Sequence, residues 1–151
     1  MRVLLDTNVL AVGMAGHALG WKSHSALIWH RLQVKEFDIL VSTHLLTELE
    51  HAWSTTWFRD HLTPDRMSRL YSLLMSQAIL VDVTHNVHGV ASHWQDDLVL
   101  AAAVSGNADF LVTRDKEFRR VGEYSGVKIR TPSEFLIELD AALDSGKTAL
   151  L

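Results

Sequence analysis

The chain contains no cysteine and only two prolines among its 151 residues. The lack of cysteine excludes a disulfide framework, a thiolate metal site and a cysteine nucleophile. No run of about 18 consecutive apolar residues occurs, so we expect no membrane-spanning helix. The N-terminal residues also lack the apolar core of a secretory signal peptide. Cytoplasmic residence fits all of these absences.

An excess of positive charge is also missing. The net charge is −4 with 14 lysines and arginines, which is not typical of a protein that simply coats nucleic acid. Nine histidines are many for this length, but their spacing matches no zinc motif with a known mechanism. With 48% hydrophobic residues, the chain can form one domain with a core. We expect that domain to span residues 1–144, with 145–151 as a loose tail.

Apolar runs that favour strands alternate with segments that favour helices, which predicts an α/β fold with a parallel sheet. The predicted strands are Arg2–Leu5, Phe37–Val41, Ile79–Val83, Phe110–Thr113 and Val127–Arg130. A glycine-rich connection containing Gly13, Gly16 and Gly20 is expected before the first helix. The predicted helices cover Trp21–Gln33, Thr43–Ser54, Thr63–Gln77, the apolar run Leu98–Val104, Lys116–Val121 and a last segment from Thr131 onward.

Both prolines indicate where helices begin. Each follows a threonine, in Thr63-Pro64 and Thr131-Pro132, which places proline at the first helical position after a capping residue. The second pair continues to Glu134 and forms a capping box.

Acidic residues stand at the ends or beginnings of several predicted elements. Asp6 and Asp115 each follow a strand, Asp96 precedes the apolar helix together with Asp97, and Glu48 lies inside a helix. Side chains at the carboxyl ends of parallel strands point into one crevice. Carboxylates gathered there repel one another unless protons or hard cations neutralise them. Each also has a structural alternative, as a turn residue, a helix cap or an exposed helical glutamate.

Taken together, this order of acidic residues resembles the PIN-domain ribonuclease family, and most of all its VapC-type toxins from bacterial toxin–antitoxin pairs. The likeness covers most of the chain. The segments that carry it are Val3-Leu4-Leu5-Asp6-Thr7-Asn8-Val9-Leu10, Val41–Leu49, Asp96–Ala103, Ala108–Asp115 and Ile129–Phe135.

The resemblance implies a three-layer α/β/α sandwich around a central parallel sheet, and a metal-dependent endoribonuclease that uses Mg²⁺ or Mn²⁺. By position, the catalytic acidic quartet would be Asp6, Glu48, Asp96 and Asp115. The implied metal ligands are Asp6, Asp96, Asp97 and Asp115, supported by Thr7, Asn8 and Thr113. The implied partners are RNA, an antitoxin protein and a second copy of the chain.

A basic run next to Asp115 is the candidate for contacts with the RNA backbone. It comprises Arg114, Lys116, Arg119 and Arg120, and a solvated surface is the alternative interpretation. The aromatic residues Trp53, Trp57 and Phe58 are expected either in the core or in an exposed patch on the helix after Glu48.

Other functions remain open. A PIN nuclease in RNA processing or DNA-structure cleavage would need no antitoxin, and a binding module could keep the fold without catalysis. A haloacid-dehalogenase-like phosphatase needs a second aspartate two residues after Asp6, where this chain has Asn8. No G-x-G-x-x-G motif follows any strand, which argues against dinucleotide binding.

Overall fold

The computed structural model describes residues 1–149. At its centre is a six-stranded sheet with the order β3-β2-β1-β4-β6-β5. Five strands run parallel, and they are β1 (Arg2–Leu5), β2 (Asp38–Val41), β3 (Ile79–Leu80), β4 (Phe110–Val112) and β6 (Val127–Arg130). The sixth, β5 (Glu123–Tyr124), pairs antiparallel with β6.

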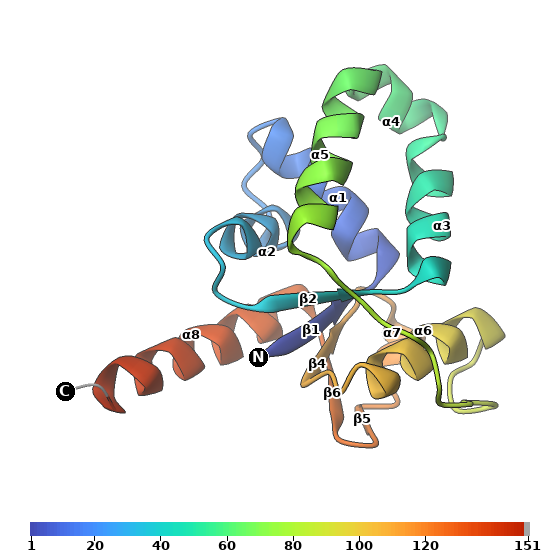
Figure 1. Cartoon of the computed structure of the whole chain (residues 1–151), viewed down its shortest axis with the longest axis vertical. Coiled ribbons are helices and arrows are strands. Elements are labelled where there is room, and N and C mark those ends of the chain that lie inside the picture. The colour runs from blue at the N-terminus through green and yellow to red at the C-terminus, as the bar shows by residue number, and fades with distance from the viewer. Residues whose placement is uncertain (150–151) are drawn as a thin grey trace.

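Helices flank the sheet, and Figure 1 shows α1 and α5 above it and α6 below it. The helices are α1 (Thr7–Ala18), α2 (His24–Gln33), α3 (Thr43–Trp53), α4 (Thr56–His61), α5 (Pro64–Gln77), α6 (Trp94–Ser105), α7 (Lys116–Arg119) and α8 (Pro132–Ala149). The predicted α/β sandwich with a mostly parallel sheet is therefore confirmed. Among the described residues, no helix is both long and apolar enough to cross a membrane.

The strand order places a topological switch point next to β1. The chain leaves β1 through α1 and α2 to reach β2 on one side, and later returns through α6 to β4 on the other side. Leu5 of β1 pairs with Val112 of β4, so both strands end at the same level. Open α/β sheets bind their ligands in the crevice at such a point.

The predicted helix starts are confirmed where a hydroxyl caps the helix. The Ser42 side chain accepts a hydrogen bond from the Leu45 N–H at 3.2 Å, and the Thr63 side chain accepts one from Arg66 at 3.2 Å. At α8 the capping box forms in both directions: Thr131 Oγ1 accepts from the Glu134 N–H, and Glu134 Oε2 accepts from the Thr131 N–H. These local bonds satisfy N–H groups that have no partner within the helix.

The glycine-rich connection expected after β1 is wrong, because Gly13 and Gly16 lie inside α1. They serve packing instead of a turn. A Cβ atom on Gly13 would stand 2.5 Å from the Ser25 carbonyl oxygen, so α1 and α2 approach too closely for any larger side chain. Of the three glycines, only Gly20 lies after the helix, at a φ of 75° that favours glycine. The helix expected from Trp21 starts at His24, after the cap Ser23.

Helix α3, which carries Glu48, ends at Trp53, one residue before the expected end at Ser54. Trp57 does not share this helix with Trp53; it lies on a separate short helix, α4, at the tip of an arm that α3, α4 and α5 form above the sheet (Figure 1). Trp53 is buried at 7% exposure, whereas Trp57 is 40% exposed and contacts Trp21 and His61. The two tryptophans belong to different environments.

Further differences lie at the sheet edges and the C-terminus. The third strand is only Ile79–Leu80. The short strand β5 was not expected; it turns into β6 through Ser125 and Gly126, both with positive φ. Helix α8 continues through most of the segment expected to be loose, as far as Ala149, and the rest of that segment lies outside the described residues.

Replacement of Gly13 by alanine should destabilise the fold, because the new methyl group would displace α1 from α2. We expect a loss of about 1–3 kcal/mol in the free energy of unfolding, measured by urea denaturation. The matched control is Gly146→Ala in α8, where a Cβ meets nothing within 4 Å and helix propensity favours alanine. Equal effects of the two substitutions would contradict the close packing of α1 on α2.

Candidate functional site

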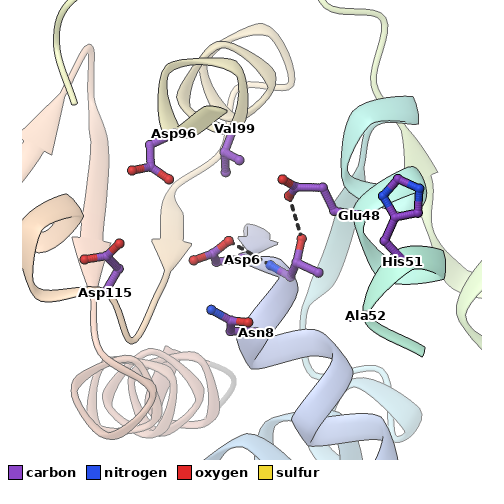
Figure 2. Close-up of a pocket in the computed structure, with 9 residues that line it drawn as sticks. Asp6, Asn8, Glu48, His51, Ala52, Asp96, Val99 and Asp115 are labelled. Carbon is purple, nitrogen blue, oxygen red and sulfur yellow. Dashed lines mark hydrogen bonds between the residues drawn. The ribbon is translucent and has the colours of Figure 1, made fainter. Parts of the chain in front are cut away.

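Four carboxylates from four separate parts of the chain line one cavity of about 340 Å³. Asp6 follows β1, Glu48 lies on α3, Asp96 is in the first turn of α6 and Asp115 follows β4. Figure 2 shows them around a common space, with Asp6 between the others. The structure thus brings together the whole acidic quartet expected from the sequence, at the switch point of the sheet.

Asp6 is held at the centre by neutral donors. Its carboxylate accepts a hydrogen bond from the Thr113 hydroxyl at 2.7 Å and another from the Thr7 N–H at 2.8 Å. Thr113 is fully buried directly after β4, so it joins the ends of the two central strands. The expected supporting role of Thr113 has a geometric basis in this bond.

Glu48 is oriented by the residue that follows Asp6. Thr7 Oγ1 donates to Glu48 Oε2 at 2.9 Å, and His44 Nε2 lies 3.4 Å from Glu48 Oε1, one turn earlier on α3. The Glu48 side chain is 32% exposed, so it borders the cavity without being enclosed. Thr7 therefore connects the start of α1 to α3, and Asn8 also lines the cavity.

Asp115 combines its site position with the helix-cap role that its sequence position also allowed. One carboxylate oxygen, Oδ1, accepts the N–H groups of Glu117 and Phe118 at the start of α7. Cap and site are therefore compatible, because a carboxylate has two oxygens. Asp96 is different: its Oδ2 is buried and has no hydrogen-bond partner among the described residues.

Burial raises the pKa of both Asp6 and Asp96 above the ordinary aspartate value. For Asp6, hydrogen bonds from Thr113 and Thr7 lower the pKa, while the charges of Glu48 and Asp115 raise it. For Asp96, the charges of the other three carboxylates add to the effect of burial. The cavity therefore resists holding four negative charges together.

The chemistry of this donor set fits a hard divalent cation. All four side chains offer oxygen, the ligand that Mg²⁺ and Mn²⁺ prefer. The buried Asp96 Oδ2 accepts no hydrogen bond from a described residue, so it is available to a cation. As they stand, no three His, Asp or Glu side chains in the described part of the chain are already arranged to hold a metal ion. The carboxylates would have to draw together around a cation.

Asp97, the neighbour expected to share the metal role, points elsewhere. It is 5% exposed and does not line the cavity. Its two oxygens accept the N–H groups of Gly89, Val90 and Ala91 at 2.7, 3.2 and 2.8 Å. On a helix, adjacent residues face about 100° apart, so only one of the pair can reach the cavity. Asp97 anchors the loop before α6, which corrects the expectation.

The basic run is divided by the structure. Arg114 is exposed and lies with Asn8 and Asp115 around a hollow next to the carboxylates. Arg120 forms an ion pair with Glu117 at 2.9 Å. Lys116 and Arg119 line neither hollow. Of the four, Arg114 is therefore the one that borders the site.

Three residues that line the cavity are not among those predicted from the sequence: His51, Ala52 and Val99 (Figure 2). Of these, His51 is the one with a polar side chain. Its spacing of three residues from Glu48 was the available signal, since residues three apart share a helix face.

The chain belongs to the PIN domain family, because residues 2–117 match the sequence model of that family. PIN domains are generally nucleases. A search of curated proteins found no match.

Two solved structures resemble the fold, both with a TM-score of 0.57. One is the crystal structure of VapBC2 from Rickettsia felis bound to a DNA fragment from their promoter. It shares 19% sequence identity with the present chain, and the matched region covers 87% of the present chain and 98% of the Rickettsia chain. The other is PAE2754 from Pyrobaculum aerophilum. It shares 22% sequence identity with the present chain, and the matched region covers 93% of the present chain and 90% of PAE2754. At these identities the likeness supports the fold alone.

Opposite changes in stability are expected for the adjacent aspartates in metal-free protein. Asp96→Asn removes a charge that burial and three carboxylates disfavour, so the melting temperature at pH 7 should rise. Asp97→Asn weakens bonds to three backbone N–H groups, so stability should fall by about 1–3 kcal/mol. Thermal unfolding in EDTA measures both. A fall for Asp96→Asn would show that this carboxylate is structural.

The pH dependence follows from the raised pKa values of Asp6 and Asp96. A carboxyl that binds its proton more tightly in the folded state stabilises the fold fully below its unfolded pKa. That contribution is lost as the pH rises from the ordinary value through the raised one. The gain from Asp96→Asn should therefore vanish in acid, where the carboxyl is protonated in both states. Melting curves of wild type and variant at a series of pH values test this, and a gain that persists in acid would contradict it.

Proposed function

We propose that this protein is a metal-dependent endoribonuclease and the toxin of a type II toxin–antitoxin pair. The observation that carries the proposal is the convergence of Asp6, Glu48, Asp96 and Asp115 on one cavity at the switch point of the sheet. Burial raises the pKa of Asp6 and Asp96, and none of the four carboxylates forms an ion pair with a described lysine or arginine. Such a set is suited to binding cations. Membership of the PIN domain family supports nuclease chemistry.

In this proposal Asp6, Asp96 and Asp115 hold Mg²⁺ or Mn²⁺. When bound, such an ion polarises a phosphate and lowers the pKa of a water molecule at the site. Glu48 completes the acidic rim and orients water, held in place by the Thr7 hydroxyl. Thr113 keeps Asp6 directed into the cavity. Asn8, at the rim, offers an amide to the substrate.

The reaction that suits this arrangement is hydrolysis of a phosphodiester. Water adds to phosphorus opposite the leaving 3′-oxygen, the P–O3′ bond breaks, and the leaving oxygen takes a proton. The products carry a 5′-phosphate and a 3′-hydroxyl. The chain's own contribution is positioning, because hydrogen bonds to residues at strand ends and helix starts orient Asp6, Glu48 and Asp115.

The proposed antitoxin partner rests on an analogy and on surface chemistry. The similar structure from Rickettsia felis is of VapBC2. In the present chain several large apolar side chains are exposed, among them Trp94 at 67% and Leu80 at 60%. Exposed apolar surface of this kind is typical of sites that bind another protein. The expected homodimer stays a prediction, to be measured by light scattering of the purified protein.

Cleavage of RNA is the direct test. We expect the wild-type protein to cut a pool of structured RNA in the presence of Mg²⁺ or Mn²⁺ and to stop when EDTA is added. Asp6→Asn, Asp96→Asn and Asp115→Asn should each lower the rate by more than about a hundredfold, because each removes a direct cation ligand. Gel analysis of end-labelled RNA gives the rates and the chemistry of the product ends.

Asp115→Asn is the most informative of these variants, because asparagine caps helices about as well as aspartate. Helix α7 should therefore form, and circular dichroism should match the wild type. An unfolded Asp115→Asn protein would mean that the carboxylate is needed for structure. Retained cleavage in a folded Asp115→Asn protein would overturn its place in the site.

A further inference from the structure

A second cavity, of about 200 Å³, lies where the N-terminal ends of α2 and α8 meet. We call it the α2–α8 cavity. Its lining includes Ser23, His24 and Ser25 from the start of α2, Pro132 and Ser133 from the start of α8, and Arg114. No carboxylate is among the described residues that line it, in contrast to the catalytic cavity.

Both helix ends leave N–H groups free at this cavity. In α2 the Ser23 hydroxyl accepts a hydrogen bond from the Ala26 N–H at 3.1 Å. The first N–H groups of the helix, of His24 and Ser25, have no acceptor within the helix. In α8 the Thr131 hydroxyl takes the Glu134 N–H, which leaves the Ser133 N–H free. Helix starts carry partial positive charge, so two of them together attract an anion.

Ser25 gives a second and independent indication of a ligand. The residue is 5% exposed, it lines the cavity, and its hydroxyl has no hydrogen-bond partner within the described residues. The hydroxyl oxygen is not one of the solvent-inaccessible atoms without a partner, so a molecule in the cavity can reach it. An oxygen acceptor bound in the cavity would provide one.

Arg114 connects this cavity to the carboxylates. It also lines a hollow with Asn8, Val12 and Asp115, of which Asn8 and Asp115 belong to the catalytic cavity and Val12 to the α2–α8 cavity. The three spaces therefore follow one another along the surface. Arg114 is exposed and forms no ion pair with any described residue, so its guanidinium is available to an anion.

We infer that the α2–α8 cavity binds a phosphodiester group of the RNA substrate, next to the group that is cut at the carboxylates. The inference rests on the proposed nuclease function and extends it. The acidic cavity repels phosphate except through a bound cation, so a strand needs an anchor of opposite charge nearby. Arg114, the Ser25 hydroxyl and the free N–H groups form that anchor, since they offer donors suited to phosphate oxygens.

The first experiment measures RNA binding without cleavage. A fluorescein-labelled single-stranded RNA of about 12 nucleotides is titrated with the full chain in EDTA, and the Kd is read from fluorescence anisotropy. Arg114→Gln should raise the Kd about tenfold and Ser25→Ala about threefold, as expected for a charged and a neutral hydrogen bond. Arg69→Gln, an exposed arginine on α5, removes the same charge elsewhere and should change the Kd less than twofold. Equal effects of the two arginine variants would overturn the inference.

The second experiment identifies the ligand's source with inorganic phosphate as the probe. In a titration followed by NMR, the amides of Ser25 and Ser133 should shift in wild type and not in Arg114→Gln. Phosphate-induced shifts combined with an unchanged Kd for RNA would mean that the cavity takes a free anion, which overturns the substrate role. Absence of both effects would also overturn it.

The proposed nuclease activity is tested separately, by RNA cleavage in the presence of Mg²⁺ or Mn²⁺. RNA binding that depends on Arg114 without any cleavage would support the α2–α8 cavity and count against the proposed enzyme. Cleavage with a KM and an RNA affinity that both stay unchanged in Arg114→Gln would support the proposed enzyme and count against RNA binding at the α2–α8 cavity.

Discussion

The pairing of β1 with β4 is the constraint on which the site depends. Because Leu5 and Val112 are register partners, Asp6 and Thr113 emerge side by side where the strands end. The hydrogen bond between them, 2.7 Å long, then fixes the central carboxylate. Glu48, Asp96 and Asp115 are arranged around that point by α3, α6 and the turn after β4. A shift of one residue between β1 and β4 would turn these side chains to the opposite face.

The negative charges of the four carboxylates are not balanced by lysine or arginine side chains within the described site. The described chain pairs its arginines with carboxylates elsewhere, for example Arg31 with Glu36 and Asp140, and Arg130 with Glu138. At the cavity, hydroxyl and N–H donors hold the carboxylates and leave their charge in place. If the proposed cation binds there, the folded state should gain stability, since ligand binding to the folded state shifts the unfolding equilibrium.

The positively charged Arg114 side chain lies next to the acidic cavity, so negative and positive charge alternate along this surface. Arg114 follows Thr113 in the chain. The same strand end therefore carries both the hydroxyl that donates to Asp6 and the positively charged Arg114 side chain that borders the α2–α8 cavity. A polyanion lying across this surface would meet carboxylates on one side of Arg114 and free N–H groups on the other. In the proposed function, this arrangement would order a strand without requiring a positive net charge for the whole chain, which is −4.

Local signals in the sequence determined the starts of α3, α5 and α8, the five parallel strands of the sheet and the positions of the acidic quartet. Caps such as Ser42, Thr63 and Thr131 act on N–H groups within the next turn, and strand ends followed by aspartate need no distant contact to be recognised. Tertiary structure decided the rest. The glycines of α1 suggest a loop until Ser25 is seen against Gly13, and Asp96 differs from its neighbour Asp97 only through which one meets the cavity and which one meets the loop at residues 89–91. Likewise, only the meeting of α2 with α8 reveals the cavity beside Arg114. In each case the deciding contacts join residues far apart in the chain, and their partners cannot be identified from local pattern alone.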